Sequence, residues 1–312
     1  RRDQPSGAGR RLDASARAHS RAPSRRRRRL GPLAVLILSF LITVLVAVLA
    51  LSLEGRIGVF GGASPTPTAP SGPAPIVLDM TGYDPARLID DEVFYDSAAM
   101  SEDEIAAFIT KVNKGCVPGD DGTPCLADAV FDTQTREVTT ACPGGYVAAT
   151  GQSAARIISG VASACGINPQ VLLVLLQKEQ GLLTASGPML TARRYEAAAG
   201  YACPDGSACA PEFSGFFAQL YGAARQFQRY RLDPGSYDFV AGTPVSIPFS
   251  PDTACGSEEL TLANQATAGL YDYTPFLPNA AAATGGDDCT SWGNWNFYGC
   301  FRAFFGSPLI TG

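Results

Sequence analysis

The longest apolar stretch of the chain runs from Leu33 to Leu53, 21 residues without a charge. A helix of that length covers the hydrocarbon thickness of a bilayer, about 30 Å, so the pattern predicts a transmembrane segment over residues 31–54. The arginines at 25–29 precede it, and basic flanks stay in the cytoplasm. We therefore expect a plasma-membrane protein with a single span, a cytoplasmic N-terminus and an extracytoplasmic C-terminal domain. A cleaved signal peptide is the alternative, because Ala47–Ala50 offers small residues, although its apolar region usually has only about 7–15 residues.

Proline and small residues dominate the stretch after this segment. Residues 61–75 read GGASPTPTAPSGPAP, with five prolines and nothing that could pack in a core. Such a composition favours an extended, semi-rigid spacer. The expected organisation is a basic cytoplasmic tail (1–30), the transmembrane helix (31–54), a linker (55–76) and one extracytoplasmic domain (77–312).

Within that domain, apolar residues recur mostly at helical spacing. Ser101 and Glu104 form a capping-box pattern before IAAFI, and we expect further helices at 152–164, 215–230 and 260–270. Alternation typical of a strand is confined to 243–249. The pattern predicts a mainly α fold with long irregular loops.

One predicted helix combines clear end signals with an apolar interior. Asn168 suits an N-cap, Pro169 the first helical position and Gly181 the C-terminal stop. Between them, VLLVLL is apolar on every side and is followed by the polar QKEQ. The helix should be buried, with its last turn emerging into a polar environment. Glu179 lies one turn beyond Leu175, on a face continuous with the core. Glu179 is therefore a candidate general acid. The simpler explanation for a Glu at this position is that it pairs with the neighbouring Lys178.

Charge divides the chain unevenly. Residues 1–30 hold 11 of the 24 Lys and Arg residues, whereas the remainder has 13 basic against 27 acidic residues. A basic run beside an apolar segment usually sets topology and contacts anionic lipid. We therefore expect the lipid bilayer, through residues 33–53, as a partner and do not expect nucleic acid.

Cysteine use points to an oxidising compartment. All nine cysteines follow the apolar segment, at positions 116, 125, 142, 165, 203, 209, 255, 289 and 300. Disulfides persist on that side of a membrane. Cys116 with Cys125, and Cys203 with Cys209, are close enough to close local loops, while the other five leave an odd member whose identity spacing does not give.

The single histidine, His19, lies in the predicted cytoplasmic tail. The outer domain can therefore contain no Ser-His-Asp triad, no Cys-His dyad and no histidine-ligated metal. A zinc site of cysteines is also disfavoured because no CxxC occurs. We expect neither a metal nor a cofactor, so that chemistry outside the membrane rests on carboxylates, Tyr, Lys or Cys.

Around Glu179 the chain resembles a known family. INPQVLLVLLQKEQGLL is similar to the signature segment of lytic transglycosylases and goose-type lysozymes, in which a buried helix ends in the catalytic Glu; Gln180 stands where the family usually has Ser. GFFAQLYGAARQF resembles the family's Gly-Leu-Met-Gln stretch, which implies cleft positions for Gly215 and Gln219. LYDYTPFLPNA resembles its Tyr-Asn-Ala-Gly-Pro stretch, which implies a catalytic position for Tyr271 and a substrate-binding one for Tyr273.

A broader resemblance covers most of residues 77–306. The segments VFYDSAAMSEDEIAAFI, LLQKEQGLLT, YDYTPFLPNAAA and WGNWNFYGCFRAFFG resemble secreted actinobacterial envelope proteins labelled hemagglutinin-like or hydrolase. Together these likenesses imply a lysozyme-like, lytic transglycosylase-like core that acts on peptidoglycan glycan strands. Glu179 would protonate the bond between MurNAc and GlcNAc and then, as a base, draw the C6 hydroxyl proton to give a 1,6-anhydro product. Hydrolysis of the lysozyme type would need a second carboxylate, for which the sequence offers Glu196, Asp205, Glu212 and Asp272.

Aromatic residues gather near the C-terminus. Phe297, Phe301, Phe304 and Phe305 fit the inner stripe of a terminal helix better than a sugar platform. Trp292 and Trp295 lie in a Gly/Asn-rich turn and are the better candidates for stacking on sugar rings. With Gln180, Gly215, Gln219 and Tyr273, they complete the expected substrate-binding set.

These inferences converge on one hypothesis and two rivals. The hypothesis is a membrane-anchored peptidoglycan-active protein that cleaves MurNAc–GlcNAc bonds with Glu179 as the single acid/base. The first rival is a non-catalytic cell-wall-binding or adhesion module that keeps the cleft. The second is a structural subunit that binds an envelope protein partner.

Overall fold

The computed structural model describes residues 72–203 and 208–310, which belong to one compact unit, Pro67–Gly312. The expected cytoplasmic tail, the transmembrane segment and most of the linker lie outside the described residues. Among the helices that are described, none has the length and apolar character needed to cross a membrane.

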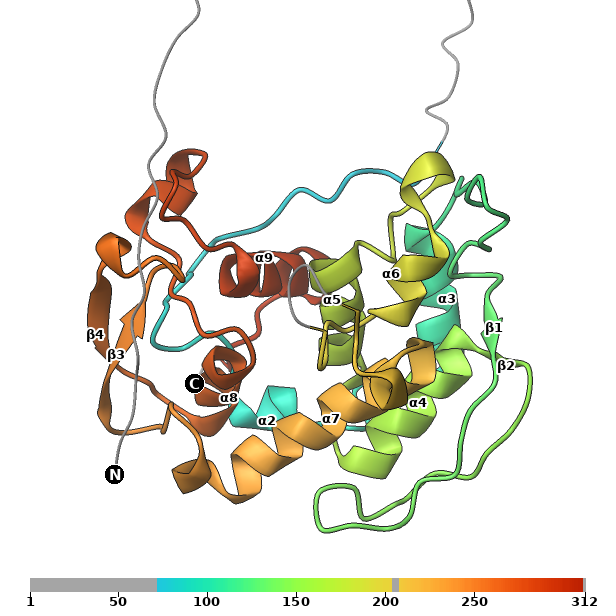
Figure 1. Ribbon diagram of the computed structural model, residues 1–312, viewed down its shortest axis with the longest axis horizontal. Coiled ribbons are helices and arrows are strands. Elements are labelled where there is room, and N and C mark those ends of the chain that lie inside the picture. Colours follow the sequence, from blue (N-terminus) through green and yellow to red (C-terminus); the bar gives the residue numbers. More distant parts are fainter. Residues whose placement is uncertain (1–71, 204–207, 311–312) are drawn as a thin grey trace, which may run out of the picture. The chain divides into compact units, whose positions relative to one another are not determined.

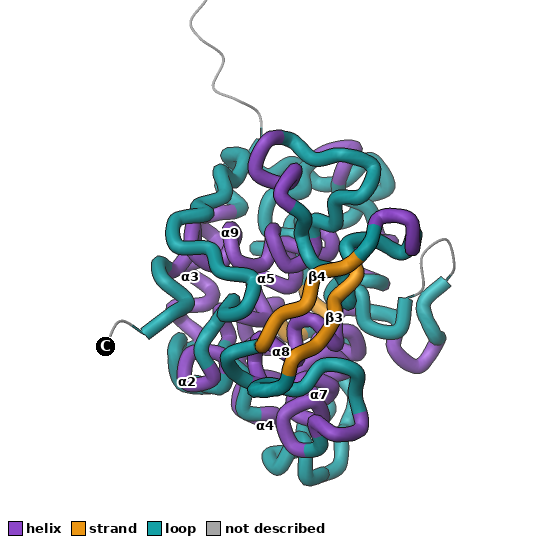
Figure 2. Tube along the Cα trace, turned by 90° about the vertical axis from the view of Figure 1, so that its left-hand side faces the viewer, coloured by secondary structure: helices purple, strands orange, loops and turns teal. Residues whose placement is uncertain are grey.

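The described part of the chain is mainly α-helical, as the sequence predicts (Figure 1). Its eight α-helices are α2 (Asp91–Phe94), α3 (Glu102–Val112), α4 (Ala154–Cys165), α5 (Pro169–Gln180), α6 (Ala192–Glu196), α7 (Phe216–Leu232), α8 (Gln265–Tyr273) and α9 (Gly293–Phe305). Its strands form two antiparallel pairs, β1 (Val130–Phe131) with β2 (Gln152–Ser153), and β3 (Pro244–Pro248) with β4 (Ser257–Thr261). Figure 2 places the longer pair along one side of the helical body.

Helix α5 is the centre of the core, with α4 and α9 packed against it (Figure 1). Every residue of Val171–Leu176 is fully buried, as the unbroken apolar run predicts. The ends are also as expected: the Asn168 side chain accepts a hydrogen bond from the Gln170 N–H at 2.7 Å, and Gly181 ends the helix with a φ of 61°. The Asn168 amide also donates to the Val93 carbonyl at 2.7 Å, which fixes α2 beside the start of α5.

Two other element predictions differ in outcome. The capping box of Ser101 and Glu104 is present at α3. The helix expected from Leu260 begins only at Gln265, because Leu260 and Thr261 belong to β4, where they pair with Val245 and Pro244. This pairing partner lies more than a dozen residues away, so local periodicity does not reveal it.

Four disulfides close the loops between helices. Both expected local pairs, Cys116–Cys125 and Cys203–Cys209, are confirmed, and the remaining bonds are Cys142–Cys165 and Cys255–Cys289. Cys300 on α9 is the odd member and is buried. Burial raises the pKa of its thiol to about 11, so that it stays protonated at neutral pH.

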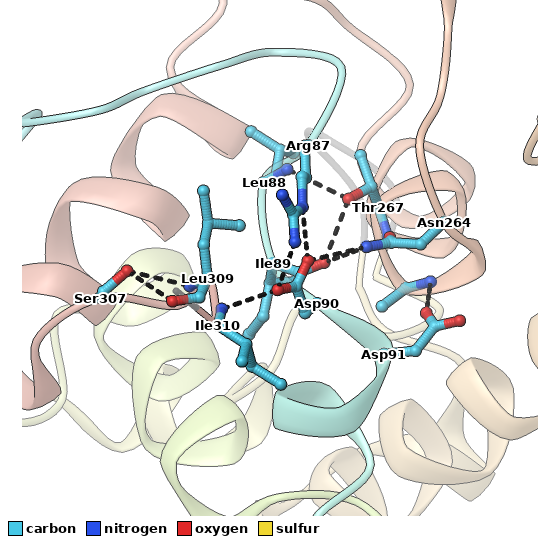
Figure 3. Close-up of polar contacts among 11 residues, drawn as sticks. Arg87, Leu88, Ile89, Asp90, Asp91, Asn264, Thr267, Ser307, Leu309 and Ile310 are labelled. Carbon is cyan, nitrogen blue, oxygen red and sulfur yellow. Dashed lines mark hydrogen bonds and ion pairs between the residues drawn. The ribbon is translucent and has the colours of Figure 1, made fainter. Parts of the chain in front are cut away.

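Asp90 joins three distant parts of the chain (Figure 3). Its carboxylate, 5% exposed, pairs with Arg87 at 2.7 Å and accepts the Ile310 N–H at 2.7 Å. The Asn264 amide, at the N-cap of α8, donates to the neighbouring Ile89 carbonyl at 2.8 Å and lies 3.4 Å from Asp90 Oδ1. Asp90 thus ties the start of the domain to α8 and to the C-terminal tail.

We expect Asp90→Ala to lower the free energy of unfolding by about 2–4 kcal/mol, because it leaves the Ile310 N–H and the Arg87 guanidinium without their buried acceptor. Urea unfolding of the oxidised domain measures this. Asp96→Ala is the matched control, since the Asp96 carboxylate is exposed and its hydrogen bond within the described residues is a local one, from the Ala98 N–H. Equal losses in the two variants would contradict the bridging role of Asp90.

Candidate functional site

Glu179 lies in the last turn of α5, where the buried helix reaches the surface. Its side chain is 24% exposed, which agrees with the expected position between core and solvent. The Arg194 guanidinium, from α6, donates hydrogen bonds to the carbonyls of Gln180 and Met189. A cation at the C-terminal end of a helix stabilises it, so Arg194 holds the segment that carries Glu179.

The neighbouring Lys178 is the direct partner of Glu179. Lys178 Nζ lies 2.5 Å from Glu179 Oε1 and donates a second hydrogen bond to Thr274 Oγ1 at 2.7 Å. The Lys178 side chain is only 4% exposed. The structure therefore contains the ion pair that the sequence suggested as the simpler explanation for Glu179.

A loop after α6 forms the wall opposite Glu179. A Cβ built on Gly200 would lie 2.8 Å from Glu179 Oε2, and its φ of 73° also favours glycine. Close approach of the backbone to the carboxylate therefore requires glycine at position 200.

Gln219 of α7 holds this loop in place. Its Oε1 accepts the N–H groups of Ala199 and Tyr201 at 3.2 and 3.0 Å. Its Nε2 donates to the carbonyls of Tyr201 and Phe213 at 2.7 and 2.6 Å. The side chain is fully buried. Gln219 therefore supports the loop from inside the domain, whereas the sequence led us to expect it in contact with substrate.

The two tyrosines of α8 occupy different environments. Tyr271 is fully buried, and its hydroxyl donates to the Pro85 carbonyl at 2.9 Å. The hydroxyl of this expected catalytic residue is therefore bound within the domain. Tyr273 lies beside the carboxylate: its hydroxyl donates to the Ala199 carbonyl at 2.7 Å, and its ring centroid is 5.7 Å from Lys178 Nζ. Burial, with the Glu179 charge adding to it, raises the pKa of Tyr273 well above its ordinary value. Its hydroxyl is therefore a proton donor in hydrogen bonds at all physiological pH values.

Gln180 and Gly215 keep some access to solvent. The Gln180 side chain is half-buried next to Glu179, and its backbone carbonyl is the one that Arg194 caps. Gly215 precedes α7, where its N–H donates to the Glu196 carbonyl at 3.0 Å. Gly215 also lines a hollow of about 390 Å³ together with Asp132 and Phe216.

The four C-terminal phenylalanines pack inward as expected, but Trp295 lies in α9, which begins at Gly293, rather than in the expected Gly/Asn-rich turn. Phe297 and Phe301 are buried in the core, whereas Phe304 and Phe305 pack partly against it. Trp292 at the start of α9 is 39% exposed. Trp295 is half-buried, with its ring 4.9 Å from that of Tyr83 between centroids.

The N-terminal end of α9 also lies close to Lys178. A Cβ on Gly293 would lie 2.3 Å from Thr274 Cγ2 and 3.5 Å from Lys178 Cε. The structure thus gathers Lys178, Glu179, Tyr273, Thr274 and the Gly200 backbone. Of these, Thr274 and Gly200 have no distinctive sequence pattern and were missed as site residues, whereas Lys178 was expected only as a structural partner of Glu179.

The candidates for a second catalytic carboxylate are placed less favourably for catalysis than Glu179. Glu196 is exposed and pairs with Arg193 at 3.3 Å, and Glu212 is exposed. Asp205 lies outside the described residues. Asp272 accepts the Phe239 N–H at 3.0 Å through Oδ1, while Oδ2 is buried without a hydrogen-bond partner among the described residues.

Burial raises the pKa of Asp272 to about 6, and the charge of Asp238 adds to this effect. Because this pKa lies above the ordinary value of 3.8, the folded state binds the proton more tightly. The stabilising contribution is complete below about pH 4 and is lost as the pH rises through about 6. We expect Asp272→Asn, which keeps the acceptor for Phe239, to be more stable than wild type at pH 7.5 by about 2 kcal/mol.

Urea unfolding of both proteins at pH 4 and pH 7.5 tests this expectation. The stability difference between them should shrink or vanish at pH 4. A difference that is the same at both pH values would mean that the Asp272 proton is not linked to folding.

No group of three or more His, Cys, Asp or Glu side chains in residues 72–203 and 208–310 could hold a metal ion. The arrangement at Glu179 instead provides a carboxyl group held by an ammonium and enclosed on one side by the Gly200 backbone. These groups can orient a proton donor or acceptor at the surface. Comparison of the chain with protein-family models, curated proteins and solved structures found no match.

Proposed function

We propose that this protein is a membrane-anchored peptidoglycan-active glycosidase of the lytic transglycosylase type. The observation that carries the proposal is the position of Glu179. A carboxyl group in the last turn of a fully buried helix is held rigidly and yet remains 24% exposed. Rigid placement of a proton donor beside solvent is what general acid catalysis requires.

The surroundings of Glu179 support a single-carboxylate mechanism. None of the described candidates for a second acid is paired with Glu179: Glu196 binds Arg193, and Asp272 binds the Phe239 backbone. In an anhydro-forming reaction, the C6 hydroxyl of MurNAc attacks its own C1, so one carboxyl group can serve as acid and then as base. The mainly helical domain, in which α5 is the buried central helix, is also compatible with the lysozyme-like core that the sequence resemblance implies.

Four disulfides indicate an extracytoplasmic location for the domain, because such bonds persist in oxidising compartments. An anchor at residues 31–54 would then confine the activity to cell wall close to the membrane. Tyr273 and Gln180 beside the carboxyl group, and the exposed Trp292, are the groups proposed to contact the glycan.

A cell-wall-binding module without catalysis is the second candidate. One specific observation favours it: Glu179 and Lys178 form a close ion pair, as two structural residues would. A protein that only binds would keep the aromatic groups and use the carboxylate as a hydrogen-bond acceptor for sugar hydroxyls.

The test is incubation of the oxidised domain, residues 67–312, with purified sacculi, followed by mass spectrometry of the soluble products. Anhydro-muropeptides would support the transglycosylase, and reducing-end products would indicate a lysozyme. Co-sedimentation with sacculi without any release would reject catalysis and favour the binding module.

A further inference from the structure

Lys178 occupies an unusual place for a lysine. Two of the three lysines in the chain, Lys111 and Lys114, are exposed, whereas the Lys178 side chain is 4% exposed. A buried ammonium is costly unless its donors are paired. Glu179 Oε1 and Thr274 Oγ1 accept from it at 2.5 and 2.7 Å.

Three helices converge on this ammonium. Lys178 extends from α5, Thr274 follows the last residue of α8, and Gly293 begins α9. The missing side chain of Gly293 leaves the room that Thr274 and Lys178 occupy, since a Cβ there would overlap Thr274 Cγ2 at 2.3 Å. The position of Nζ is therefore set by tertiary packing as well as by Glu179.

The two oxygens of Glu179 have different surroundings. Oε1 is bound to Lys178, while Oε2 is the oxygen nearest to Gly200. Among the described residues, the hydrogen bond and the ion pair of the Glu179 carboxyl group both involve Oε1 rather than Oε2. A side chain at position 200 would take the space beside Oε2, with its Cβ at 2.8 Å.

We propose that Lys178 is a positioning residue that fixes the Glu179 carboxyl group through Oε1 and leaves Oε2 as the oxygen that exchanges protons with the glycan. This inference rests on the proposed function. Oε2 gives its proton to the glycosidic oxygen as the bond from C1 to that oxygen breaks. It then takes the proton of the C6 hydroxyl as the new bond from O6 to C1 forms, and the carboxylic acid is restored. Lys178 keeps its protons throughout.

Thr274 gives the ammonium a second partner besides Glu179. Its hydroxyl accepts a hydrogen bond from Nζ at 2.7 Å, so that the place of Nζ does not depend on the carboxyl group alone. The Tyr273 ring, 5.7 Å from Nζ, closes the other side of the ammonium.

The kinetic experiment compares Lys178→Met and Thr274→Val with Lys111→Met, the same substitution at an exposed lysine. Misplacing a catalytic group by about 1 Å costs on the order of a hundredfold. We expect Lys178→Met to lower kcat about 10- to 100-fold with unchanged binding to sacculi, and Thr274→Val to lower it less. Lys111→Met should match wild type, and thermal melting identifies any variant that fails to fold.

The comparison of kcat with binding separates positioning from a general loss of packing. A loss of packing would lower the melting temperature and weaken binding to sacculi together with kcat, whereas misplacement of one carboxyl group lowers kcat alone. A Lys178→Met variant with the kcat of Lys111→Met would overturn the inference.

A measurement without substrate distinguishes this inference from the proposed function. Crystal structures of the substrate-free domain, as wild type and as Lys178→Met, should differ in the position of the Glu179 carboxyl group. An unchanged position of this group would overturn the positioning role even in an active enzyme. A domain that releases no muropeptides would overturn the proposed function and the role of Oε2, whereas a displaced carboxyl group would still show that Lys178 holds it.

Discussion

We expect Glu179→Gln to reduce muropeptide release from sacculi by about a hundred- to ten-thousandfold, the range that general acid–base catalysis contributes. The amide has nearly the size and shape of the carboxylic acid but cannot give a proton to the glycosidic oxygen. Its oxygen can still accept a hydrogen bond from Lys178 Nζ, so that the packing around α5 is preserved. Release rates by mass spectrometry, with binding to sacculi measured in parallel, give the result.

Glu258→Gln is the matched control for this substitution. Glu258 is exposed on β4, so its replacement should leave both release and folding unchanged. Full activity of a folded Glu179→Gln variant would sink the catalytic proposal. An equal loss in both variants would instead point to a general effect of removing negative charge.

Gln219→Leu should cause the largest loss of stability that we predict, about 3–4 kcal/mol. The substitution keeps the volume but leaves two backbone N–H groups, of Ala199 and Tyr201, and two carbonyls, of Tyr201 and Phe213, without their buried partner. Each such group costs about 1–3 kcal/mol, reduced here by local rearrangement. Because these bonds hold the loop that carries Gly200, activity should fall as well. Urea unfolding and amide hydrogen exchange at Ala199 and Tyr201 report the two effects.

Gln226→Leu controls for the loss of a buried glutamine on the same helix. Gln226 is also buried, but its side-chain oxygen accepts only a long hydrogen bond, at 3.3 Å from Arg229, its side chain also interacts with the Tyr230 hydroxyl, and neither contact holds a loop backbone. Its replacement should cost about 1 kcal/mol or less. Similar losses at the two positions would contradict the special role of Gln219 as the support of the loop.

Local sequence signals predicted the element that carries Glu179. Asn168, Pro169 and Gly181 fix the ends of α5 within a few residues, and six consecutive apolar residues fix its burial. The same holds for the capping box of α3 and for the two disulfides that span short loops. In these cases the cause and its effect lie next to each other in the chain.

The features that depend on contacts between distant residues were not predictable. The start of α8 was misplaced because β4 pairs with β3, and the register of α8 decides that Tyr273 rather than Tyr271 lies beside Glu179. Gln219 was expected in the cleft, but only the packing of α7 against the loop after α6 reveals that its amide is enclosed. Lys178 was considered as a partner of Glu179, but its contact with Thr274 joins residues that lie far apart in sequence.

The buried thiol of Cys300 has a consequence for biogenesis in an oxidising compartment. A chain with nine cysteines offers many wrong pairings, and an accessible odd thiol could attack correct bonds and reshuffle them. Cys300 sits on α9, and α9 packs on the central helix α5. Docking of α9 therefore hides this thiol, so that in the folded domain it does not reach the disulfides that it could otherwise reshuffle.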